Sequence, residues 1–149
     1  MQKHIVLSAF ALLAVAGATP AKQPESPAQV VFDKYQSLER SFDPALADLY
    51  CDSALIRNTR KYPNSQTRTI EIPAAKYKEL IRTSLPVAKT SGDYSTYSNV
   101  VFAPAGSNVR ITATRYSVLK KYSSPMSLLV GSCRGSGWGV LEEIGVSQP

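Results

Sequence analysis

Few side chains of this 149-residue chain combine the type and the placement that catalysis needs. The only histidine is His4, and it lies within residues 1–18. These residues are typical of a secretory signal peptide, because a basic start precedes an apolar run and the small residues Ala16-Gly17-Ala18. Cleavage after Ala18 leaves a mature chain without imidazole, the commonest general base near neutral pH. That loss excludes Ser-His-Asp and Cys-His nucleophile systems and the usual zinc ligand sets, so we expect neither a metal nor a cofactor.

Two charged residues, Glu142 and Arg115, occupy positions where strand alternation places apolar side chains. Glu142 falls on the face of the last predicted strand that carries Trp138, Val140, Ile144 and Val146, and Arg115 falls on the face that carries Val109, Ile111, Ala113 and Leu119. An ionised side chain on an apolar face needs a partner or a wet pocket. We therefore predict an interior pair that orients a ligand, with Glu142 as a base if burial raises its pKa. A structural ion pair is one alternative. A β-bulge that turns Glu142 outward and Glu143 inward is the other.

The composition restricts the partners and the compartment. The chain is basic, with a net charge of +6 that falls by one when Lys3 leaves with the signal peptide. No motif that combines aromatic and basic residues is present, so we expect no nucleic acid partner. The apolar run of the signal is shorter than the roughly 20 residues of a membrane span, so we expect no stable span after cleavage. A periplasmic or secreted location also favours a disulfide between Cys51 and Cys133, although two buried free thiols are the alternative.

The N-terminal half is predicted to be mainly helical. After a flexible lead-in at residues 19–25, Ser26 and Pro27 begin a helix whose apolar residues recur at helical spacing. A second short helix follows Asp43-Pro44. A short hairpin (54–60 and 67–72) then precedes a third helix at 74–85, which Pro86 is expected to end.

The C-terminal half is predicted to consist of four strands, at 94–103, 109–122, 126–134 and 138–146. Short connections between them indicate an antiparallel meander. Residues 26–149 therefore form one α+β domain. A curved antiparallel sheet of four main strands, with the short hairpin in addition, wraps around three helices on one of its faces.

This order of elements, together with two segments, resembles the nuclear transport factor two-like superfamily, which includes ketosteroid isomerase and scytalone dehydratase. The segments are Ala47–Ile56, which looks like a helix end running into the first strand, and Gly137–Glu143, which looks like the final strand. The resemblance implies a cone with a pocket in its open end and a homodimer through the sheet. Tyr35 falls near the tyrosine that donates to the oxyanion in the isomerase, and Asn58 falls at or near its general-base aspartate. An amide cannot accept that proton, and the mature chain has no histidine for dehydratase chemistry.

Three functions are compatible with these residues. The first is an exported, non-catalytic domain that binds a small apolar or amphipathic ligand, or an envelope partner, through Tyr35, Asn58, Arg115 and Glu142. The second is a lyase or isomerase in which Tyr35 donates to an oxyanion and Glu142 takes the proton. The third is an assembly module of the cell envelope, with the sheet as an oligomer interface and an acidic partner bound by Arg57, Arg60 and Lys61.

Overall fold

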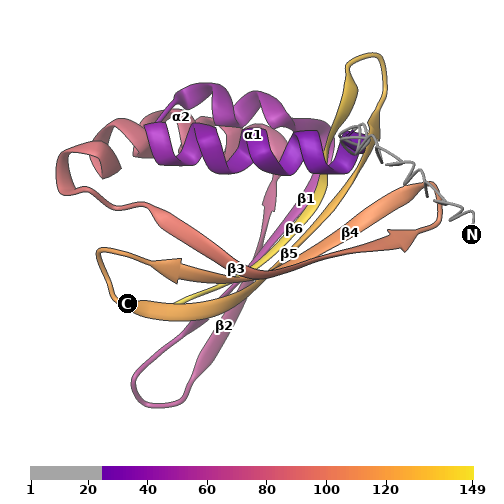
Figure 1. Cartoon of the computed structure of the whole chain (residues 1–149). Coiled ribbons are helices and arrows are strands. Elements are labelled where there is room, and N and C mark those ends of the chain that lie inside the picture. The colour runs from indigo at the N-terminus through magenta and orange to yellow at the C-terminus, as the bar shows by residue number, and fades with distance from the viewer. Residues whose placement is uncertain (1–24) are drawn as a thin grey trace, which may run out of the picture.

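The computed structural model describes residues 25–149, and the predicted signal peptide lies outside them. One six-stranded sheet carries both helices on one face, which we call the inner face; the opposite face is the outer face (Figure 1). The elements are α1 (Pro27–Ser41), a 3₁₀ helix η1 (Pro44–Leu49), β1 (Tyr50–Lys61), β2 (Thr67–Pro73), α2 (Ala74–Ser91), β3 (Ser95–Ala105), β4 (Asn108–Ser117), β5 (Tyr122–Cys133) and β6 (Gly137–Ser147). This confirms the α+β class and the helices gathered on one side of a curved sheet.

The strand order is β2-β1-β6-β5-β4-β3. β3 to β6 form the predicted antiparallel meander. The predicted hairpin of β1 and β2 joins the same sheet, because β1 pairs with β6 in parallel. The sheet is therefore mixed rather than purely antiparallel, and its C-terminal strand lies in the middle.

Local signals set the helix ends. The Ser26 side chain accepts a hydrogen bond from the backbone N–H of Gln29 at 3.2 Å, which is the predicted N-cap of α1. The predicted end of the third helix at Pro86 is wrong, since α2 continues through Pro86 and ends at Gly92, which adopts φ 67° as a left-handed cap. Proline removes one backbone hydrogen bond. The adjacent Leu85 is buried in the core, and we infer that this packing helps to hold the helix past that point.

Two other predicted boundaries are wrong. β1 begins at Tyr50, directly after the 3₁₀ helix η1, rather than at the predicted residue 54. The break predicted at residues 123–125 lies inside β5, whereas the chain turns earlier, where Lys121 adopts φ 57°. Pro125 is tolerated in the strand because the pairing of β5 with β6 begins only at Met126, so Pro125 has no partner strand on that side.

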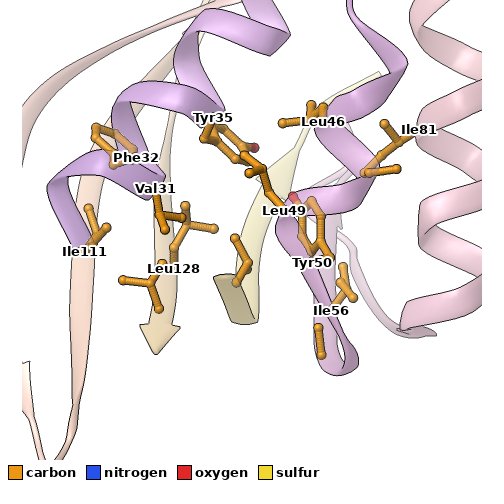
Figure 2. Packing of buried hydrophobic residues seen from close by; sticks show 14 of the residues in the cluster. Val31, Phe32, Tyr35, Leu46, Leu49, Tyr50, Ile56, Ile81, Ile111 and Leu128 are labelled. Atoms are coloured by element: carbon orange, nitrogen blue, oxygen red, sulfur yellow. The ribbon is translucent and has the colours of Figure 1, made fainter. Parts of the chain in front are cut away.

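The core lies between the inner face and the two helices (Figure 2). Fully buried strand residues form its floor, and α1 covers them with Val31 and Phe32. The floor residues are Ile56, Ile111, Leu128, Val130 and Val140. Burying side chains of this size stabilises the fold by about 1.5–3 kcal/mol each.

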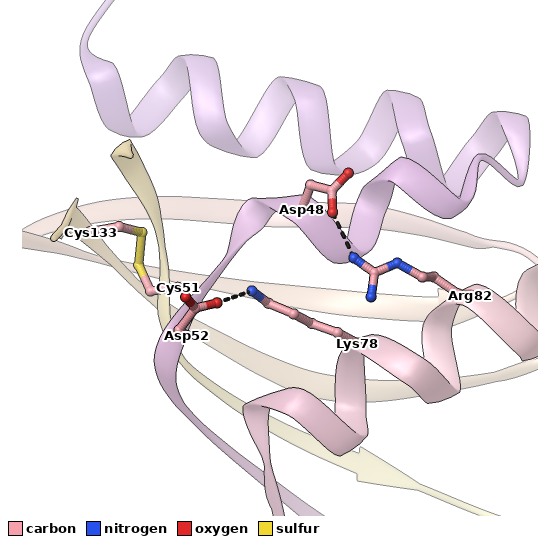
Figure 3. A network of polar contacts seen from close by, with 6 residues as sticks. All are labelled: Asp48, Cys51, Asp52, Lys78, Arg82 and Cys133. Atoms are coloured by element: carbon pink, nitrogen blue, oxygen red, sulfur yellow. Dashed lines mark hydrogen bonds and ion pairs between the residues drawn. A yellow bond between two sulfur atoms is a disulfide. The ribbon is translucent and has the colours of Figure 1, made fainter. Parts of the chain in front are cut away.

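A disulfide and two ion pairs join the elements at one side of the core (Figure 3). The predicted disulfide between Cys51 of β1 and Cys133 of β5 is present, with a Cα–Cα distance of 5.3 Å. Asp52 pairs with Lys78, and Asp48 pairs with Arg82, so β1 and η1 are both tied to α2. Both carboxylates are exposed, so water screens these pairs and they add little to the stability of the fold. None of the helices within residues 25–149 is long and apolar enough to cross a membrane.

Candidate functional site

A β-bulge in β6 decides which glutamate faces the helices. Val130 pairs with Val140 and Leu129 pairs with Glu142, so Leu141 is an extra residue on the β6 side. Val140 and Glu143 consequently share the inner face, and Glu142 lies on the outer face. The predicted pair of Glu142 with Arg115 is not formed, because Glu142 instead accepts a hydrogen bond from Arg110 at 2.6 Å. The predicted alternative, a bulge that turns Glu143 inward, is the arrangement found.

Glu143 is the centre of a buried carboxyl–phenol cluster. Tyr50 of β1 donates a hydrogen bond to its Oε2 atom, and Tyr77 of α2 donates to its Oε1 atom at 3.0 Å. Burial raises the pKa of Glu143, and the two hydrogen bonds and the positive charge of Arg115 lower it in part. Burial, followed by the charge of Glu143, holds the pKa of both phenols well above the usual value for tyrosine. The tyrosines therefore act as neutral donors.

A second, partly buried carboxyl lies on α1. Glu39 accepts a hydrogen bond from the Tyr97 hydroxyl of β3, and burial raises its pKa. Tyr35, one helical turn before Glu39, packs between Phe32 and Tyr97, with ring centroids 6.4 Å and 6.0 Å apart. Sequence reasoning missed Glu39, although the spacing of four from Tyr35 places both on one face of the helix.

A polar row crosses the inner face beyond this core. Arg115 of β4 lies two residues past Ala113 on the same face and pairs in register with Ser124 of β5. Farther along the sheet, Arg60 of β1 lies level with Ser147 of β6 and with Arg68 of β2. Because side chains alternate between the two faces of a strand, these residues lie on the same face of the sheet as the apolar floor. Within residues 25–149, none of these three arginines takes part in an ion pair.

A cavity of about 270 Å³ opens at the β1–β2 end of this row. Asn58 lies in it, and its Oδ1 atom accepts a hydrogen bond from the Ser147 hydroxyl at 2.8 Å. The other lining residues are Arg60, Tyr62, Arg68 and Ile70. This is a polar and basic cavity with an apolar side.

The structure separates the four residues predicted to bind a ligand. Asn58 and Arg115 lie on the polar part of the inner face. Tyr35 lies on the core-facing side of α1 and has 6% of its surface exposed. Glu142 is on the outer face. The hypothesised pair of Tyr35 as oxyanion donor and Glu142 as base is therefore not brought together, because the bulge at Leu141 reverses the alternation.

A further prediction concerned the basic segment 57–61. The basic segment 57–61 is divided between the two faces: Arg57 lies on the outer face and pairs with Glu71 at 2.8 Å, whereas Arg60 lies in the inner-face row. The described part of the chain contains no group of three or more metal-ligating side chains.

Comparisons with known proteins concern the fold rather than the site. No family model and no curated protein matches the sequence. Among solved structures, an NTF2-like protein of unknown function from Shewanella oneidensis matches with a TM-score of 0.59 at 9% identity, over 81% of this chain and 97% of that one. Another from Pseudomonas putida matches with a TM-score of 0.58 at 13% identity, over 80% and 83%. An NTF2-like protein from Streptomyces avermitilis, suggested to be a dehydratase, matches with a TM-score of 0.55 at 9% identity, over 80% and 92%.

These likenesses define the class of fold. The chain has the NTF2-like cone fold, in which a curved sheet wraps around helices. At this level of identity, the function must be argued from the site of this chain itself.

Proposed function

We propose that the chain is an exported, non-catalytic domain that binds a small amphipathic ligand on the inner face of its sheet, beyond the helices. The observation that carries the proposal is the basic cavity at the β1–β2 end, which combines Asn58 and Ile70 with two arginines that form no ion pair within residues 25–149. Ligand sites of small molecules are concave and combine apolar surface with a few polar groups that orient the ligand.

The buried carboxyl–phenol cluster gives the catalytic alternative less support. A general base must lie within hydrogen-bond reach of the substrate proton. Glu143 is 9% exposed, and both of its oxygen atoms already accept hydrogen bonds from tyrosines. The cluster is more easily understood as the polar centre of the core, since a buried carboxyl that is fully hydrogen-bonded keeps a single arrangement.

The disulfide supports export. Disulfides persist mainly in oxidising compartments, and the bond between Cys51 and Cys133 joins strands that are far apart in sequence. A periplasmic or secreted domain is therefore the form that we propose for the mature protein.

The experiment is a search for bound ligand. Native mass spectrometry of gently purified mature protein should show a bound small molecule, and decanol, decanamide or decanoate should raise the midpoint of thermal unfolding. Ile70→Asp places a charge at the apolar side of the cavity and should reduce the shift that decanol produces. Thr69→Asp, the neighbouring position on the outer face, is the matched control and should leave the shift unchanged. A protein that has no bound molecule and responds to none of these compounds would contradict the proposal.

A further inference from the structure

Two buried polar atoms on the inner face have no hydrogen-bond partner within the described residues. They are the Nε atom of Arg115 and the hydroxyl of Ser124. The two residues pair directly across β4 and β5, so both unsatisfied groups lie at one place on the sheet. Buried polar groups are nearly always paired in folded proteins, and each exception calls for an explanation.

The guanidinium of Arg115 is poorly satisfied along one edge. Its Nη2 atom has a partner only in the Tyr122 hydroxyl, at the long distance of 3.4 Å. The Nε and Nη2 atoms are on the same edge of the group, which is one of the edges that a carboxylate can contact through two parallel hydrogen bonds. Arg115 is therefore able to bind such a carboxylate.

The acidic groups of the interior do not supply that carboxylate. The charges of Glu39 and Glu143 are near enough to interact with Arg115, but neither residue forms an ion pair with it. Tyr97 donates to Glu39, and Tyr50 and Tyr77 donate to Glu143. The tyrosines thus hydrogen-bond to both carboxyl groups, and the guanidinium of Arg115 forms no ion pair within residues 25–149.

The rest of the polar row has the same sign of charge. Arg60 and Arg68 lie directly opposite each other in register, an arrangement that is unfavourable for like charges in a sheet. Neither pairs with a carboxylate in the described part of the chain. An anion on the inner face would offset the repulsion and would be attracted by all three arginines.

We propose that the ligand of this domain is an acid whose carboxylate accepts hydrogen bonds from Arg115 and Ser124. This inference rests on the proposed function and specifies its ligand class.

The test compares acid with neutral compounds of equal chain length. Isothermal titration calorimetry with decanoate, decanol and decanamide should give the lowest Kd for decanoate. Arg115→Met should weaken decanoate binding by about tenfold or more, since it removes a charged, two-point contact. Arg115→Lys should give an intermediate loss, because it keeps the charge without the planar fork. Arg57→Met, on the outer face, is the matched control and should leave binding unchanged.

A second variant keeps the test independent of folding. Ser124→Ala removes a hydroxyl that has no partner to lose, so the variant should fold and should bind decanoate less tightly than the wild type. If decanol binds as tightly as decanoate, and Arg115→Lys and Ser124→Ala both bind decanoate like the wild type, the acidic class is overturned while the binding domain stands. If no compound binds and no molecule co-purifies, the proposed function itself is overturned.

Discussion

Removing the disulfide should lower the free energy of unfolding more than removing either of the two ion pairs at the same side of the core. The bond closes a loop with a sequence separation of 82 residues. In the chain-entropy model, a loop of this length stabilises the folded state by about 4.5 kcal/mol at 25 °C. For a domain of this size, that free energy corresponds to a loss on the order of 15 °C in the unfolding midpoint.

The double variant Cys51→Ala/Cys133→Ala tests this value by urea denaturation of the mature protein. Reduced wild-type protein is the control for the change in side chains, and it should lose a similar amount of stability. The variant should not respond to reductant at all. A variant within about 1 kcal/mol of the oxidised wild type would refute the loop-closure reasoning. Two titratable free thiols in untreated protein would refute the bond itself.

Two further predictions concern β6. In Glu143→Gln, the pH dependence of the free energy of unfolding should become flatter. Burial raises the pKa of Glu143 in the folded state, so the stability that this group contributes is present below its ordinary pKa and is lost as the pH rises through the raised pKa. Urea titrations from about pH 4 to about pH 8 measure this, and equal slopes in wild type and variant would contradict it. Gly139→Ala should destabilise the domain by about 1–3 kcal/mol, because the added Cβ atom would lie 2.6 Å from the Leu49 backbone oxygen. Gly145→Ala, whose Cβ atom would lie 3.4 Å from the Asn58 amide nitrogen, is the control. If both variants lower the midpoint of thermal unfolding equally, the clash at Gly139 is not the cause.

Signals that act over a few residues made part of the fold predictable. Ser26 and Pro27 begin α1 as expected because capping depends only on adjacent residues. The meander follows from short connections, and the pairing of Cys51 with Cys133 follows from an even count in an oxidising compartment.

Features that depend on distant residues were not predictable in this way. The parallel pairing of β1 with β6 is decided by the closure of the whole sheet. The extra residue Leu141 reverses the alternation behind the prediction for Glu142. Pro86 lies inside α2, and its neighbour Leu85 packs in the core. Helix propensity does not include such packing between distant residues.

The candidate site was predicted in part for the same reason. Arg115 was identified from its position on a strand and Asn58 from the family resemblance, and both lie on the inner face. Ser124 was assigned to a break between strands, so its unsatisfied hydroxyl could not be anticipated. The homodimer through the sheet stays a prediction, for which sedimentation velocity is the direct measurement.

The central place of β6 has a consequence for biosynthesis. β1 and β2 connect to the rest of the sheet only through this strand, which follows the other five along the chain and is therefore synthesised after them. A growing chain that stops before Gly137 contains two separate strand groups and no continuous sheet. The sheet thus cannot be completed until β6 has been synthesised, so the earlier strands must wait for this one to join them.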